Sequence, residues 1–197
     1  MKRSSIIAFV VLGVILIVAI GLLSWVVGSR NHFVGLDENV KTQWAQVENQ
    51  LQRRYDLIPN LVETVKGFAT HEKDVFVRVT EARSKVAGAG NIPDKIKANN
   101  ELSSALARLL VVVERYPEIK SNQNFLALQT ELSGTENRLS TERRRYNERV
   151  RDYNTAIRLF PGSLIAGFFS FTRAELFEAP EEARPAPKVD FGTGDTD

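Results

Sequence analysis

The stretch NQNFLALQTELSGTENRLSTERRRYNERVRDYNTAIRLF, residues 122–160, carries the strongest periodic signal in the chain. Large apolar or aromatic side chains recur in it at every seventh position: Phe125, Leu132, Leu139, Tyr146, Tyr153 and Phe160. A sustained repeat of this kind places one face of a helix against neighbouring helices. Thr135 and Glu142 lie between these positions, which favours a helix of a bundle over a free two-stranded coiled coil. We therefore expect one helix of about 58 Å over residues 122–160.

A second helical pattern lies upstream, over residues 36–58. Its apolar residues follow steps of three and four: Leu36, Val40, Trp44, Val47, Leu51, Tyr55 and Ile58. Charged and amide side chains fill the positions between them, so this segment predicts an amphipathic helix with one buried stripe.

Pro59 interrupts this second pattern. A proline inside a helix removes one hydrogen bond and crowds the carbonyl of Tyr55. Either it kinks a long helix or it starts a turn that reverses the chain. Apolar residues flank Pro59 without a glycine or turn cluster, which favours the kink. On that interpretation the helical pattern continues to Val86, with Gly67 as a weak point.

The clearest loop is GAGNIPD at residues 88–94. Asp94 is a candidate cap for a further helix that runs to about Tyr116, after which Pro117 suits the start of another helix. Together these patterns predict an all-α protein. Its main part is an elongated antiparallel bundle of three to four long helices over residues 36–173.

A run without any charged residue occupies positions 6–27. As a helix it rises about 33 Å, enough for a hydrocarbon core of roughly 30 Å. The alternative is a cleaved secretory signal, but the run is longer than such cores and lacks an A-x-A site before Ser29. We expect a retained transmembrane helix after a short flank at residues 1–5, followed by a juxtamembrane linker at 28–35.

Two segments follow the helix expected at residues 122–160. Residues 163–171 are apolar but too short to cross a bilayer. We expect them to pack on the bundle, with contact to lipid or to a partner as the alternatives. Residues 174–197 form an acidic tail rich in proline, glycine, alanine and threonine, and this composition predicts disorder.

Charge at the ends of the span predicts the topology. Lys2 and Arg3 precede the span, whereas Arg30 is the only charge after it before Asp37. The positive-inside rule then places the N-terminus in the cytoplasm and the bundle on the opposite side of the membrane.

Several motifs resemble those of the LemA family of bacterial membrane proteins. The most specific is RRYDLIPNLV at residues 53–62, followed by ETVKGFA at 63–69 and His71-Glu72. The resemblance returns in these places: Glu114-Arg115-Tyr116-Pro117, Phe125 with Leu128-Gln129, Thr135-Glu136-Asn137-Arg138, Tyr146-Asn147 and Tyr153-Asn154. It extends from the anchor to about Phe171. It implies a single-pass protein of the bacterial inner membrane with an α-helical soluble domain and no established enzymatic activity.

No motif in the sequence indicates catalysis, a cofactor or a metal. His71-Glu72 begins like a zinc-protease motif, but Val75 stands where the second histidine is needed. The chain has no cysteine, which excludes disulfides and a catalytic thiol. Its formal net charge is only +2, so nucleic acid is not an expected partner.

Two groups of residues are candidates for docking a partner. One surrounds Pro59 and consists of Arg53, Arg54, Asp56 and Asn60. Asn60 has a structural alternative, because it could satisfy the carbonyl that the proline leaves free. The other group is Arg143, Arg144 and Arg145. Acidic residues interleave with it, which favours a salt-bridged helix face over a patch for anionic lipid or an acidic partner.

The sequence therefore predicts a non-catalytic scaffold or adaptor, anchored in lipid by its first helix. It would bind a membrane or envelope protein through its helix surfaces, with homo-oligomers as a further option. The alternatives are a membrane-remodelling protein that assembles on lipid and an accessory subunit of a membrane quality-control protease.

Overall fold

The computed structural model describes residues 3–177, and the predicted disorder of residues 178–197 lies outside this range. The elements are α1 (Arg3–Lys66), α2 (Lys73–Gly88), α3 (Ile92–Glu114), α4 (Pro117–Lys120), α5 (Gln123–Ala156) and α6 (Gly162–Phe168). Residues 3–177 contain no strand, which confirms the all-α expectation.

Helix α1 is one continuous helix of 64 residues. At 1.5 Å per residue it extends about 96 Å. Its N-terminal part is the one segment among the described residues that is long and apolar enough to cross a membrane, and no protein covers it. The expected linker at 28–35 is wrong, because these residues are helical and Phe33 is buried against other parts of the chain.

The first chain reversal lies at Gly67 and not at Pro59. Pro59 lies inside α1, which confirms the expectation that the helix continues through this proline. The expectation that helix continues from Leu61 to Val86 is wrong. After Lys66 the carbonyl of Val65 accepts from the amides of Phe68 and Ala69, which closes the helix end. Ala69 is fully buried, so packing at the tip holds the turn in place.

The loop predicted at residues 88–94 is shorter than expected. Helix α3 already begins at Ile92, and the side chain of Asn91 caps it by accepting from the backbone N–H of Asp94. Asp94 is therefore the donor of this bond and not the cap. The earlier start is tolerated because Pro93 lies in the first turn, where its missing N–H costs no helical bond.

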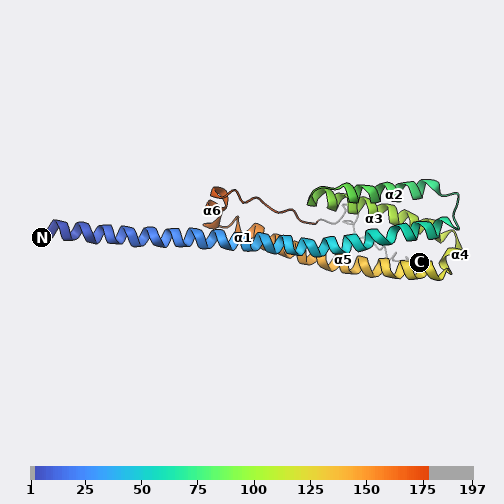
Figure 1. The fold of residues 1–197 in the computed structure, drawn as a ribbon, viewed down its shortest axis with the longest axis horizontal. Helices are drawn as coiled ribbons and strands as arrows, with labels where there is room; N and C mark the ends of the chain where they lie inside the picture. The colour runs from blue at the N-terminus through green and yellow to red at the C-terminus, as the bar shows by residue number, and fades with distance from the viewer. Residues whose placement is uncertain (1–2, 178–197) are drawn as a thin grey trace, which may run out of the picture.

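Helices α1, α2, α3 and α5 alternate in direction along a rod (Figure 1). Helices α1 and α5 pair along most of the bundle, whereas α2 and α3 pair with each other beside its membrane-distal half. The buried residues accordingly form two clusters. The distal cluster lies among all four helices. The proximal cluster lies between α1, α5, α6 and the segment that follows α6, and Ile96 near the start of α3 also belongs to it.

The heptad of α5 is confirmed as the buried seam through Tyr153. Its last predicted member, Phe160, is instead 80 % exposed. The physical reason is that α5 ends at Ala156, so Phe160 no longer lies on the face that carries the seam. The apolar segment after Pro161 forms α6, which packs on α1 through Ile165 and Ala166.

Candidate functional site

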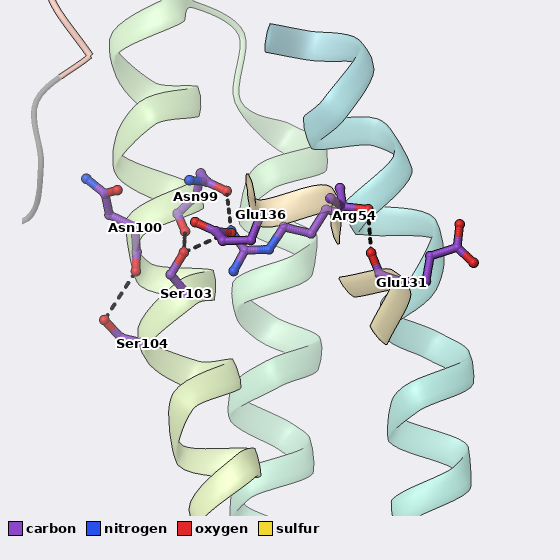
Figure 2. Close-up of polar contacts among 8 residues, drawn as sticks. Arg54, Asn99, Asn100, Ser103, Ser104, Glu131 and Glu136 are labelled. Atoms are coloured by element: carbon purple, nitrogen blue, oxygen red, sulfur yellow. Dashed lines mark hydrogen bonds and ion pairs between the residues drawn. The ribbon is translucent and has the colours of Figure 1, made fainter. Parts of the chain in front are cut away.

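A layer of polar side chains lies between the two apolar clusters of the bundle, and Figure 2 shows its contacts. Arg54 of α1 donates to Asn99 Oδ1 at 3.2 Å and to Ser103 Oγ at 3.0 Å, both on α3. The same guanidinium lies 2.9 Å from Glu136 Oε2 of α5. Leu51 precedes Arg54 in the proximal cluster and Ile58 follows it in the distal cluster. One arginine thus ties three helices together at the level where the clusters meet.

Arg54 is only 6 % exposed, so it is not a docking residue, contrary to the sequence-based expectation. Burial lowers the pKa of its guanidinium, and the charge of Glu136 opposes that shift. A buried charge without partners is strongly unfavourable, so these contacts constrain which turns of α1, α3 and α5 can face each other. We interpret Arg54 as a residue that sets helix register.

The other residues expected around Pro59 lie on the outside of α1. Arg53 pairs with Glu131 of α5 at 2.5 Å, and Asp56 accepts from Gln52 at 2.8 Å. Asn60 is exposed, and its backbone carbonyl accepts from Thr64 Oγ1. This group is therefore divided between a buried structural residue and a surface that remains a candidate for docking.

The run Arg143–Arg145 is divided in the same way. Arg145 pairs with Glu142 at 2.8 Å, as expected for a salt-bridged helix face. Arg144 is exposed. Arg143 is half-buried, and its guanidinium lies 4.1 Å from the ring centroid of Phe177. Burial lowers the pKa of Arg143, while nearby Glu136 opposes that shift.

The most regular polar contacts join α5 to residues 172–177, an extended segment that we call the strap. Two Tyr-Asn pairs on α5 bind its backbone. Tyr153 donates to the carbonyl of Thr172 at 2.8 Å, and Tyr146 donates to that of Glu175 at 2.9 Å.

The two asparagines bind one strap residue each, at both its backbone groups. Asn154 donates to the carbonyl of Ala174 at 2.8 Å and accepts from its N–H at 2.9 Å. Asn147 does the same with Phe177, at 3.0 and 2.7 Å. Each amide side chain thereby forms with one strap residue the two backbone hydrogen bonds that a neighbouring β-strand would form.

The spacing of these contacts follows from the two backbone geometries. The Tyr-Asn pairs are seven residues apart on α5, a rise of about 10.5 Å. Their partners in the strap are three residues apart, and three extended residues cover about 10 Å. A heptad of α5 and a tripeptide of the strap are therefore commensurate, so a repeated pair can bind a straight segment.

Phe177 fixes the end of the strap in the proximal cluster. It is 2 % exposed, and its ring centroid lies 6.3 Å from that of Trp44. Trp44 also contacts Tyr146 edge-on at 5.2 Å. The pKa of Tyr146 is raised to about 12, first by burial and then by the charge of Glu175. Its neutral hydroxyl is therefore retained as a donor.

The strap corrects one sequence-based expectation. Residues 174–177 were expected to belong to a disordered tail, but they pack on the bundle. The sequence did contain a signal for the binding of the strap, because the Tyr-Asn pair recurs after seven residues. Apolar packing does not explain an asparagine beside a buried seam, so a polar partner could have been expected there.

Residues 3–177 bring together no group of three or more His, Asp or Glu side chains that could hold a metal ion. His71 is exposed near the tip of the bundle. The geometry described here binds peptide backbone and sets helix register, and neither arrangement presents a nucleophile beside a base.

Comparison with known proteins identifies a family and several bacterial relatives of the chain. Its residues 43–191 match the LemA family, so the match includes the strap and extends beyond Phe171, where the sequence motifs stop. Two similar relatives are magnetosome proteins MamQ 1 and MamQ 2 of Paramagnetospirillum magneticum. Each is 28% identical over 202 residues, covering 89% of this chain and 74% of the relative.

The magnetosome protein MamQ of Magnetospirillum gryphiswaldense is 27% identical, over 75% of this chain and 64% of its own length. Similarity therefore covers the helical body as well as the motifs around Pro59. The family match alone spans more than half of the sequence. The chain is a member of the LemA family.

Proposed function

We propose that the protein is a non-catalytic scaffold of the bacterial envelope, which holds partner proteins at a fixed place beside the membrane. The observation that carries this proposal is the continuity of α1, which runs as one helix from the membrane span to the far end of the bundle. From residue 28 to Lys66 it rises about 58 Å, so it sets how far the bundle extends.

A rigid connection of this kind favours a scaffold for a physical reason. A flexible linker lets a tethered domain sample many positions, whereas a continuous helix restricts its height and orientation. Partners that bind the bundle then meet at a raised effective concentration. The MamQ relatives, named as magnetosome proteins, are compatible with a task at a membrane.

The proposal places the bundle outside the cytoplasm, in the inner membrane of a bacterium. Lys2 and Arg3 before the span support this orientation. The chain has no cysteine, so single replacements at Ser5 and Gly194 can be tested with a membrane-impermeant maleimide on spheroplasts. Labelling at Gly194 alone is expected. Labelling at Ser5 alone would reverse the orientation and direct the search to cytoplasmic partners.

The scaffold itself is tested by photo-crosslinking in living cells. A benzophenone amino acid is placed at Val111 on α3 or at Arg144 on α5, both exposed positions. We expect a few discrete adducts with envelope proteins, identified by mass spectrometry. The same cells without irradiation are the control. Repeated absence of any discrete adduct at both positions would contradict the proposal.

The principal alternative is a membrane-remodelling protein that assembles on lipid. In the same experiment it would give adducts only between copies of this chain. Purified full-length protein reconstituted into anionic vesicles would then also change their shape under electron microscopy, which a scaffold is not expected to do.

A further inference from the structure

We propose that α6 and the turn before it form a second membrane contact, which seats the base of the bundle on the headgroup region of an anionic bilayer. This contact goes beyond the proposed scaffold, because it names a lipid-binding surface apart from the transmembrane helix. It rests on where α6 is held, on which side chains it exposes, and on the charges around it.

Helix α6 is held against α1 close to the membrane span. A methyl group added at Gly162 would lie 2.9 Å from the ring of Phe33, so only glycine allows this approach. Ile165 is buried in the same cluster, against which Val26 packs. The guanidinium of Arg30 lies 5.5 Å from the ring centroid of Phe169. Helix α6 therefore lies beside residues 26–33 of α1.

That position corresponds to the lipid headgroups. The apolar run of α1 ends at Val27, and the first charged residue after it is Arg30. Headgroups add about 5–8 Å to each side of the hydrocarbon core. Residues 28–33 rise about 9 Å, so they pass through this layer. A helix packed beside them lies at the depth where amphipathic helices bind membrane surfaces.

The surface that this region exposes is apolar. Leu159, Phe160, Leu164 and Phe168 are 62 %, 80 %, 66 % and 81 % exposed. Outside the membrane span, Val111 is the only other large apolar residue described as more than 60 % exposed. A cluster of this kind normally marks an interaction site. Its place beside the span makes the bilayer the surface that covers it.

The charges around α6 favour anionic lipid. No Asp or Glu occurs in residues 153–174 or in residues 1–36. Both segments carry arginines near the proposed contact, among them Arg30 and Arg158. Basic residues beside inserted aromatic and leucine side chains are the usual composition of an interfacial helix. Phosphate headgroups would neutralise these arginines.

The test uses spin labels in the full-length chain, reconstituted in vesicles that contain anionic phospholipid. Single cysteines replace Leu164 or Phe168, and Val111→Cys is the matched control, because it is equally exposed but lies on α3 in the distal half. Collision rates with oxygen, which partitions into lipid, and with a water-soluble nickel chelate are measured at each site. Circular dichroism checks that helix content is unchanged.

We expect an oxygen-to-nickel ratio severalfold higher at residues 164 and 168 than at 111. A ratio equal to that at 111 would mean that α6 faces water, which would overturn the proposal. Low collision rates with both reagents would mean that protein covers the site, such as a second copy of the chain, and would also overturn it. Either result leaves the scaffold untouched, because crosslinking at Val111 and Arg144 tests that separately.

Discussion

The distal half of the bundle buries its core among four long helices, whereas the proximal half is built mainly on α1 and α5, with Ile96 near the start of α3 as the one buried residue from another long helix. In the distal half, fully buried residues such as Val65, Val79 and Leu109 come from three different helices. In the proximal half, α1 and α5 run together, and α6 and the strap complete the enclosure. Aromatic residues are more frequent there than in the distal cluster: Phe33, Trp44, Tyr146, Tyr153 and Phe177.

The difference shows how a two-helix region can remain ordered next to a membrane. Two helices bury one seam but leave its edges open to water. Large aromatic rings fill the seam, and the strap closes an edge by bonding its backbone to the Tyr-Asn pairs. The polar layer at Arg54 lies between the halves, so it aligns a region held by four helices with one held mainly by α1 and α5.

The largest expected effect comes from deleting the central side chain of each half. Trp44→Ala should lower the free energy of unfolding of the bundle by about 3–5 kcal/mol, and Leu109→Ala by about 2–5 kcal/mol. Only Trp44→Ala should also speed hydrogen exchange in residues 171–177, because Trp44 contacts Phe177. Equal exchange of the strap in both variants would show that the halves are not separate.

The polar layer gives the next effect. Arg54→Ala should lower the free energy of unfolding by about 1–3 kcal/mol, because it leaves Asn99 and Ser103 without their donor. The triple variant Arg54→Met, Asn99→Leu and Glu136→Leu should recover stability, since it replaces both charges of the ion pair and the amide beside it with apolar side chains. Thermal denaturation followed by circular dichroism measures both variants. A triple variant that is less stable than Arg54→Ala would contradict a role of the layer in helix register alone.

Loss of one of the two asparagine amides that bind the strap should affect the proximal half alone. Asn147→Ala removes two hydrogen bonds to Phe177 and should make local opening of the strap easier by about 1–2 kcal/mol. Hydrogen exchange of residues 172–177 measures this opening. Asn137→Ala, at an exposed asparagine of the same helix, is the control and should leave exchange unchanged.

The smallest effect is a pH dependence of the strap. The pKa of Tyr146 is raised to about 12 in the folded chain, against an ordinary value near 10. Its contribution to stability is fully present below pH 10 and is lost as pH rises toward 12. Tyr146→Phe should therefore reduce the loss of strap order over this range, as followed by a fluorophore on a cysteine at Leu176. An identical alkaline profile in both chains would exclude Tyr146 as the cause.

Sequence patterns predicted the helices well where a long stripe of apolar residues is present. The heptad from Phe125 to Tyr153 is buried as expected, and so is the stripe from Val40 to Ile58 except for Tyr55, which is half-buried. The local breaks were harder to predict. Pro59 is the stronger helix breaker, yet the chain turns at Gly67, because packing of the tip around Ala69 decides where reversal occurs.

The candidate docking residues were predicted less well. An arginine in a run of charged residues is normally exposed, and Arg54 follows Arg53 directly in the sequence. Burial of Arg54 depends on Asn99 and Glu136, which are 45 and 82 residues away in the chain. No local pattern carries that information.

The sequence by itself determined the span, the helical class and the seam of α5, because each depends on periodicity within one continuous segment. Only the tertiary structure decided that Arg54 is internal, that Tyr-Asn pairs bind the strap, and that α6 lies beside the end of the span. Each of these depends on segments far apart in the chain, whose side chains acquire their surroundings only when the helices pack.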